Sequence, residues 1–139
     1  MTTAHLSPYL FFPDQAREAM EYYRTVFGGE LTMQTFAEMG MSGDPSNDDR
    51  IMHAQLVTPN GLVLMSSDVP DGVPYQPGSA VSLALSGDDE PTLRGMFDAL
   101  AEGGEVIEPL EQAPWGDTFG ACVDRFGTSW MVNIGSSPT

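Results

Sequence analysis

Apolar and polar positions alternate along the chain in blocks, and the first block predicts a strand, a helix and three further strands. Residues 9–12 form a short apolar run typical of a strand, and Pro13 and Asp14 mark a turn into a helix. The apolar side chains of that helix recur at helical spacing up to the stop at Gly28-Gly29: Ala16, Ala19, Tyr22, Tyr23, Val26 and Phe27. Runs at 31–36, 51–57 and 62–66 predict the remaining strands, with a hairpin turn at Asn60-Gly61.

The same pattern restarts 75 residues further on (82 minus 7). Residues 6–10 align with residues 81–85 without a gap, and the glycine pair at 28–29 aligns with the pair at 103–104. An acidic helix entry at 86–91 leads into a second helix, and runs at 106–107, 119–123 and 129–134 predict strands. Because solenoid repeats have periods of roughly 20 to 50 residues, we expect two similar βαβββ modules related by a pseudo-twofold axis.

The two modules are expected to form one domain that spans residues 1–139. Module one covers about 1–68, a connector rich in proline and glycine covers about 69–79, and module two covers about 80–135. Neither half alone could bury enough apolar surface to be comfortably stable, so the modules should depend on each other. The segment 39–49, rich in Gly, Ser, Asp, Asn and Pro, is a loop that could cover a pocket.

Charge and composition restrict the classes of molecule that this protein can bind. Twenty acidic residues against five basic ones give a formal net charge of −15, which repels phosphate backbones and anionic membranes, so we expect no nucleic-acid and no membrane partner. No apolar run approaches the roughly 18 residues of a membrane-spanning helix, and no secretory signal is visible, which predicts a cytoplasmic protein. The single Cys122 lies in a strand-like run and is expected to be a buried, inert thiol.

Six segments in order carry a family resemblance: SPYLFF at 7–12, REAMEYY at 17–23, FAEM at 36–39, MHA at 52–54, MSSD at 65–68 and DRFGTSWM at 124–131. Together they resemble the PhnB-like branch of the vicinal oxygen chelate superfamily, which includes glyoxalase I, bleomycin-resistance proteins and extradiol dioxygenases. The resemblance implies an α+β fold in which the two modules form a half-open mixed β-barrel flanked by helices. It also implies a homodimer.

Metal-dependent members of this superfamily take two ligands from each module, one from its first strand and one from its last. The matching positions here are Ser7 and Ser82, with Met65 and Met131 four residues after the turn glycines. Neutral hydroxyls and thioethers are poor ligands for zinc, iron, nickel or manganese, so we expect the superfamily metal site to be absent and no cofactor to be needed. A divalent metal at a displaced site is the alternative.

The residues that remain predict an apolar pocket with a few polar anchors. Its expected lining is Ser7, Tyr9, Met65, Ser82, Trp115, Phe119 and Met131. Two other interpretations stay open. The methionines could fill a closed core, and Trp115 could plug the open edge of the half-barrel instead of packing on a ligand.

His53 and Glu38 are the candidates for catalysis. His53 shares its predicted strand face with Gln55, so it is a hydrogen-bonded structural residue, a dimer contact or a general base, although no carboxylate is visibly placed beside it. Glu38 precedes the 39–49 loop and is either an acidic group at the pocket mouth or a solvated side chain.

These observations favour a small-molecule binding protein without the superfamily metal site, whose ligand the sequence does not identify. A metal-dependent glyoxalase-type isomerase or lyase, or a dioxygenase, is the alternative, and a dimeric scaffold without catalysis is a third. Enzymatic activity is therefore left undecided. No glycine-rich cofactor loop occurs in a suitable context, and the basic residues do not cluster as an anion site would require.

Overall fold

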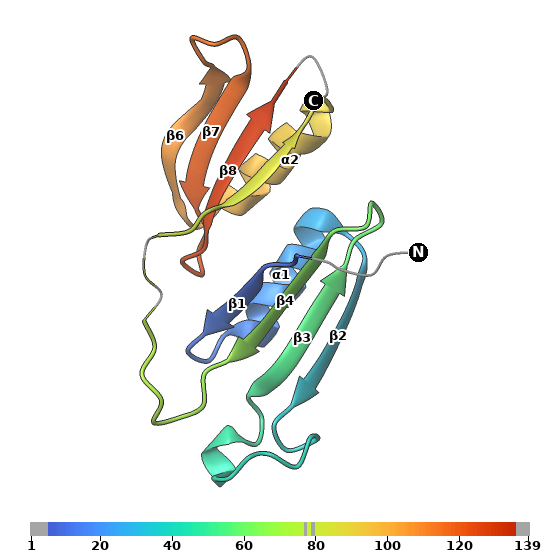
Figure 1. The fold of residues 1–139 in the computed structure, drawn as a ribbon, viewed down its shortest axis with the longest axis vertical. Coiled ribbons are helices and arrows are strands. Elements are labelled where there is room, and N and C mark those ends of the chain that lie inside the picture. Colours follow the sequence, from blue (N-terminus) through green and yellow to red (C-terminus); the bar gives the residue numbers. More distant parts are fainter. Residues whose placement is uncertain (1–5, 77, 79, 136–139) are drawn as a thin grey trace. The chain divides into compact units, whose positions relative to one another are not determined.

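The computed structural model describes residues 6–76, 78 and 80–135, and these form two compact units, Met1–Pro77 and Gly78–Thr139 (Figure 1). Each unit contains a four-stranded mixed sheet and one α-helix in the order βαβββ. The predicted α+β fold with a repeated module is therefore confirmed. The half-open barrel and the single domain of 1–139 stay predictions.

Unit one has the sheet order β1-β4-β3-β2, in which β1 and β4 are parallel and the other neighbours are antiparallel. A short 3-10 helix, Pro45–Asn47, lies in the loop between β2 and β3. The strands and the α-helix of unit one are β1 (Tyr9–Phe12), α1 (Ala16–Phe27), β2 (Glu30–Thr35), β3 (Ile51–Val57) and β4 (Val63–Asp68).

Unit two repeats this topology with the order β5-β8-β7-β6, and β5 and β8 form its parallel pair. Both units therefore have a parallel strand pair at one edge of the sheet and an antiparallel pair at the other, as two copies of one module should. The elements are β5 (Leu83–Gly87), α2 (Glu90–Ala101), β6 (Glu105–Gln112), β7 (Thr118–Val123) and β8 (Ser129–Ile134).

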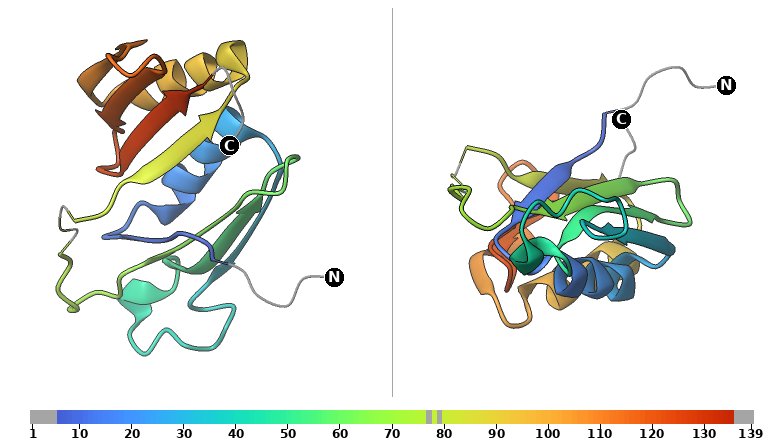
Figure 2. Two further views of the ribbon diagram at one scale, coloured as in Figure 1. Left: turned by 45° about the horizontal axis from the view of Figure 1, so that its top comes forward. Right: turned by 90° about the horizontal axis from the view of Figure 1, so that it is seen from below.

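Each helix covers one face of its own sheet, as Figures 1 and 2 show. In unit one the buried stripe of α1, which includes Met20 and Tyr23, packs over strand residues such as Ala54 and Leu56. Burial of this stripe supplies most of the stability that a helix of 12 residues lacks in isolation. We call the opposite surface of each sheet its helix-free face.

The repeated glycine pairs have a common structural cause. Gly28 and Gly103 adopt positive φ angles of 76° and 80° just beyond the helices, where residues with a Cβ atom are strained. A Cβ atom on Gly29 would lie 2.1 Å from the carbonyl oxygen of Val57, and one on Gly104 would lie 2.1 Å from that of Val123. In both units the second glycine thus lets the chain cross the end of the third strand in close contact.

Strand β6 is much longer than the predicted run at 106–107. It is an exposed edge strand in which only Leu110 is buried, and it contains glutamates and Pro109. Edge strands tolerate proline and charge, so the alternation that marks half-buried strands is missing there. Among the described residues no helix is long and apolar enough to cross a membrane.

Candidate functional site

The helix-free face of unit one brings two of the predicted pocket residues side by side. Tyr9 and Met65 are direct partners in the parallel pair β1–β4, and Gln55 of β3 lies opposite Met65 on its other side. Residues that face each other across neighbouring strands point to the same side of a sheet. Tyr9 is 40% exposed and Met65 half-buried, so a phenol, a thioether and an amide share one accessible row.

His53 joins this row through Tyr9. The phenol oxygen lies 3.3 Å from His53 Nδ1, and it can donate when the imidazole proton is on Nε2. The two rings are 5.9 Å apart, and the ring of Phe11 lies 5.1 Å from that of Tyr9. His53 therefore has a phenol partner on a solvent-accessible surface, and the arrangement can offer one polar group within an aromatic patch.

The helix-free face of unit two contains Met131 and Phe119. Met131 of β8 lies between Ala84 and Ala121, and Phe119 lies opposite Asn133. The ring of Trp115, in the β6–β7 hairpin, is 6.0 Å from that of Phe119 in an edge-to-face arrangement. Trp115 is 66% exposed, so the structure brings three predicted pocket residues into one unit with an aromatic surface.

The strand registers show which positions of the repeat are equivalent. Tyr9 pairs with Met65, and Ala84 pairs with Met131; Tyr9 and Ala84 are separated by the repeat offset (84 minus 9 is 75). The two methionines therefore occupy equivalent places.

The expectation that Ser7 and Ser82 lie on the first strands needs correction, because β1 begins at Tyr9 and β5 at Leu83. Both serines precede their strands, although the carbonyl oxygen of Pro8, the residue after Ser7, still accepts the backbone N–H of Met65 at 3.1 Å. Ser7 is half-buried and Ser82 is exposed.

At the positions expected to match the superfamily's metal ligands, this chain has the hydroxyls of Ser7 and Ser82 and the thioethers of Met65 and Met131. Neither group is a good ligand for the metals that imidazole and carboxylate hold. Within residues 6–76, 78 and 80–135, no three His, Cys, Asp or Glu side chains gather into a group that could hold a metal ion.

Glu38 belongs to a turn. Its carboxylate accepts the backbone N–H of Thr35 at 2.8 Å, and its own N–H donates to the Thr35 hydroxyl at 3.0 Å. The hydrogen bond from the Thr35 backbone, followed by that from the Thr35 side chain, lowers the pKa of Glu38. In the described part of the chain, no hydrogen bond or ion pair joins Glu38 to His53, and the exposed carboxylate closes the turn after β2.

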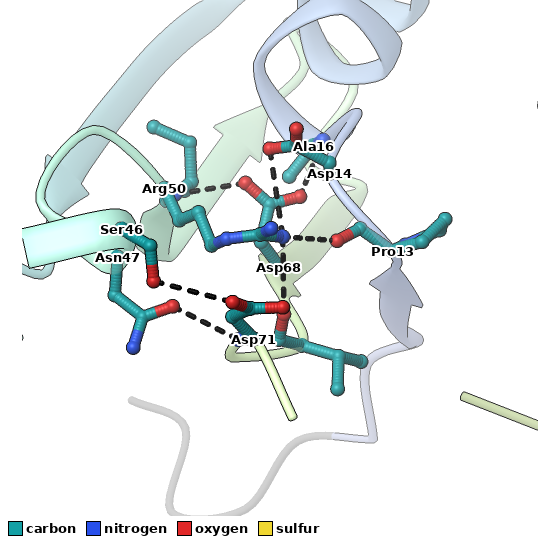
Figure 3. Close-up of polar contacts among 10 residues, drawn as sticks. Pro13, Asp14, Ala16, Ser46, Asn47, Arg50, Asp68 and Asp71 are labelled. Carbon is teal, nitrogen blue, oxygen red and sulfur yellow. Dashed lines mark hydrogen bonds and ion pairs between the residues drawn. The ribbon is translucent and has the colours of Figure 1, made fainter. Parts of the chain in front are cut away.

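Asp68, the last residue of the MSSD segment, is a buried structural joint (Figure 3). Its carboxylate accepts the backbone N–H of Ala16 at 2.9 Å and that of Ile51 at 2.8 Å, which ties the starts of α1 and β3 to the end of β4. Beside it, Arg50 donates to the carbonyl oxygen of Pro13 and lies 3.6 Å from the carboxylate of Asp14.

The loop between β2 and β3 is fastened to the connector that follows β4. The backbone N–H of Asp71 donates to Asn47 Oδ1 at 2.9 Å, and the Ser46 hydroxyl donates to the Asp71 carboxylate at 3.3 Å (Figure 3). Asn47 is buried and also donates to the carbonyl oxygen of Ser42. These bonds hold the segment that leads into β3, the strand on which His53 lies.

The DRFGTSWM segment is also structural. The buried carboxylate of Asp124 accepts the backbone N–H groups of Phe126 and Thr128, and it accepts the indole N–H of the buried Trp130 at 2.8 Å. Cys122 is buried as predicted, and burial, with the nearby Asp124 charge, raises the pKa of its thiol to about 11. The thiol is therefore not poised as a nucleophile.

Sequence reasoning missed Phe11 and Gln55 as members of the unit-one surface. Phe11 is 57% exposed and follows Tyr9 by two residues, so strand alternation places both on the helix-free face. That period of two was the available signal. Gln55 could be placed beside Met65 only once the β3–β4 register was known.

Comparison with known proteins identifies relatives over nearly the whole chain. The family model described as 3-demethylubiquinone-9 3-methyltransferase matches residues 4–133. The protein YjdN of Escherichia coli K12 is 30% identical, over 93% of this chain and 94% of its own. The crystal structure of PA1353 from Pseudomonas aeruginosa has a TM-score of 0.80 at 38% identity and covers 95% of this chain and 98% of its own.

Other solved structures extend the comparison. A Bacillus cereus protein described as a putative 3-demethylubiquinone-9 3-methyltransferase, PhnB protein, has a TM-score of 0.74 at 26% identity, over 95% of this chain and all of its own. The glyoxylase/bleomycin resistance protein/dioxygenase domain from Frankia has a TM-score of 0.67 at 17% identity, over 99% and 96% of the two chains. Listeria monocytogenes FosX, solved with Mn(II), has a TM-score of 0.62 at 15% identity, over 97% and 94%. The last two share the fold.

Proposed function

The chain belongs to the 3-demethylubiquinone-9 3-methyltransferase (PhnB-like) family, within the vicinal oxygen chelate superfamily, and on that premise we propose that it binds a small molecule without a metal ion. A ligand would contact the helix-free face of one unit through the predicted pocket residues of that unit. In unit one these are Ser7, Tyr9 and Met65, and in unit two they are Ser82, Trp115, Phe119 and Met131.

The observation that carries this proposal is the row of Tyr9, Met65 and Gln55 together with the Tyr9–His53 contact. Aromatic and thioether groups supply apolar contact area, while the phenol, imidazole and amide supply directed hydrogen bonds. Ligand sites commonly combine a mostly apolar lining with a few placed polar groups. The same row offers no carboxylate to accompany His53 as a general base.

No metal ion is proposed, because the side chains at the expected ligand positions are poor metal donors. The fold accepts a metal where side chains suit it, since FosX was solved with Mn(II). In this chain the equivalent strand positions hold Met65 and Met131, whose neutral sulfur atoms are poor partners for manganese, zinc or iron. Binding should therefore persist in the presence of a chelator.

Methyl transfer, which the family description names, is not part of the proposal. The glycine pairs lie at the helix ends, where Gly29 and Gly104 pack on strand backbone, so they do not form a cofactor-binding loop. The turns that lead from β1 to α1 and from β5 to α2 contain carboxylates, including Asp14 and Asp89. Asp89 caps α2 by accepting the N–H of Thr92, so this helix start already holds a negative charge.

The proposed assembly is a homodimer. Large apolar side chains outside the proposed ligand surfaces are exposed on both units, Leu62 in unit one and Val106 and Ile107 in unit two. Exposed apolar surface of this kind is typical of protein or ligand interfaces, and closed oligomers of one chain are usually twofold symmetric. Sedimentation equilibrium should give twice the chain mass of 15.0 kDa, and a monomer at micromolar concentration would contradict the dimer.

Methyl-labelled methionine provides the test of binding. A library of neutral, cationic and anionic aromatic fragments is screened by NMR of the Met methyl groups, with and without EDTA. Hits should shift the Met65 or Met131 signals, leave the fully buried Met20 of α1 unchanged, and behave identically in EDTA. Hits that bind only after zinc, nickel or manganese is added would overturn the proposal, as would stoichiometric metal in protein purified without chelators.

A further inference from the structure

Strand β6 presents three glutamates on a single side of the sheet. Glu105, Glu108 and Glu111 are three residues apart, a spacing that would place them on alternate faces of a regular strand. The β6–β7 register is irregular between Val106 and Glu108 and again between Glu108 and Glu111. Each irregularity adds a residue to β6 and restores the glutamate side chains to the same face.

Their partners on β7 identify that face. Glu105, Glu108 and Glu111 lie opposite Val123, Ala121 and Phe119, which are every second residue of β7. Ala121 is in turn opposite Met131, so the row belongs to the helix-free face. The other face is the core side, where Leu110, Cys122 and Trp130 are buried.

An aromatic surface adjoins this row of carboxylates. Glu111 is the direct cross-strand partner of Phe119, whose ring lies 6.0 Å from that of the exposed Trp115. A carboxylate in register with an aromatic ring, beside a second ring, is a combination that attracts organic cations, because the ring face and the carboxylate are both negative. Met131 extends the apolar part of the surface.

The charges on this face have no basic partner within the described residues. None of the strands contains lysine or arginine. Arg94 pairs with Glu90 on α2 at 3.1 Å and reaches β6 only through the backbone, where it donates to the carbonyl oxygen of Leu110 at 3.4 Å. Arg125 donates to the carbonyl oxygen of Glu102. The remaining arginines belong to unit one, at positions 17, 24 and 50. No ion pair involves the three β6 glutamates in the part of the chain that the structure describes.

We propose that the helix-free face of the β5-β8-β7-β6 sheet binds an organic cation, an ammonium group carried on an apolar or aromatic body. This inference rests on the proposed small-molecule function and specifies its ligand class. The ammonium group lies between Glu108 and Glu111, and the body packs on Phe119, Trp115 and Met131. Charge complementarity selects this occupant, because an anionic ligand would meet only carboxylates here.

Three matched probes test the ligand class. They share a phenylbutyl body and end in a trimethylammonium group, a neutral tert-butyl group or a sulfonate. Binding is followed by the Met131 methyl signal and by tryptophan fluorescence, in which exposed Trp115 should respond and buried Trp130 should not. We expect the ammonium probe to bind most tightly, the tert-butyl probe more weakly and the sulfonate most weakly.

The decisive variant is E108Q/E111Q, with E21Q/D98N as its control. Both doubles remove two negative charges from exposed positions, but Glu21 and Asp98 lie on the helices. E108Q/E111Q should weaken the ammonium probe about threefold to tenfold and leave the tert-butyl probe unchanged, whereas E21Q/D98N should change neither. Unchanged melting temperatures confirm that both variants are folded.

Several outcomes would overturn the inference. Equal affinity for the ammonium and tert-butyl probes would show that the charge is not recognised, as would unchanged binding by E108Q/E111Q. In either case, a shift of the Met131 signal by the neutral probe would leave the proposed function standing. Hexalysine that competes as strongly as the ammonium probe would indicate general charge attraction only. If no probe shifts Met131, the cation site is rejected, and the fragment screen decides the proposed function separately.

Discussion

The indole N–H of Trp130 donates to the carboxylate of Asp124 across 2.8 Å, inside unit two, where both side chains are buried. The other oxygen of the same carboxylate accepts two backbone N–H groups of the β7–β8 turn, those of Phe126 and Thr128. One side chain thus closes the turn and positions the aromatic core residue that follows it. The family signature in this segment is explained by folding and needs no role in chemistry.

Removing this carboxylate should be among the most damaging single changes in unit two. Asp124→Ala leaves the indole and turn N–H groups without their acceptor, and we expect a loss of about 2–4 kcal/mol in the free energy of unfolding. Urea denaturation followed by circular dichroism measures it. Asp98→Asn on the exposed side of α2 is the control and should stay within about 0.5 kcal/mol. Equal stability of the two variants would contradict the structural role of Asp124.

Two glycine-to-alanine changes in unit two should have opposite effects on stability. Gly104→Ala would place a Cβ atom 2.1 Å from the Val123 carbonyl oxygen, and should cost about 2–4 kcal/mol. Gly95→Ala lies in the interior of α2, where the new Cβ would meet no atom outside the helix backbone within 4 Å, and should stabilise by about 1 kcal/mol. Thermal unfolding of both variants checks the signs, and a tolerated Gly104→Ala would refute the close crossing.

Loosening the loop that precedes β3 should change dynamics more than stability. Asn47→Ala removes the acceptor for the Asp71 N–H and the donor to the Ser42 carbonyl oxygen. Hydrogen–deuterium exchange should accelerate in residues 40–49 and 69–73, with a global loss of about 1–2 kcal/mol. Ser46→Ala, which loses only the longer hydroxyl contact to Asp71, is the milder comparison. Exchange that is unchanged in both variants would show that these bonds do not hold the loop.

Cys122 should make stability depend on pH in the alkaline range. Its pKa is raised from 9.0 to about 11 in the folded protein, so the folded state holds the thiol proton more tightly than the unfolded state. The resulting stabilisation is complete below pH 9 and is lost as the pH rises through 11. The free energy of unfolding should therefore fall faster over this range than in Cys122→Ala, and parallel curves would contradict the shift.

The local pattern of the sequence was sufficient to predict the helices and most of the strands, and their repetition in two modules. The spacing of Ala16, Ala19 and Tyr23 predicted the buried stripe of α1, and Asn60-Gly61 predicted the β3–β4 hairpin, because these signals act between residues close along the chain. Met20, fully buried, was missed in that stripe. Counting four residues past the turn glycines Gly61 and Gly127 also predicted the equivalence of Met65 and Met131, which the strand pairings confirm.

Only the tertiary structure decided which side chains share a surface. The spacing of Glu105, Glu108 and Glu111 says nothing about a common face until the β6–β7 register supplies two irregularities. The contact of Tyr9 with His53 and the joint at Asp68 join residues about 44 and 52 positions apart, and such pairs depend on strand order and register. Local composition determined the elements of this protein because it sets backbone preference, whereas its candidate binding surfaces depend on long-range pairing.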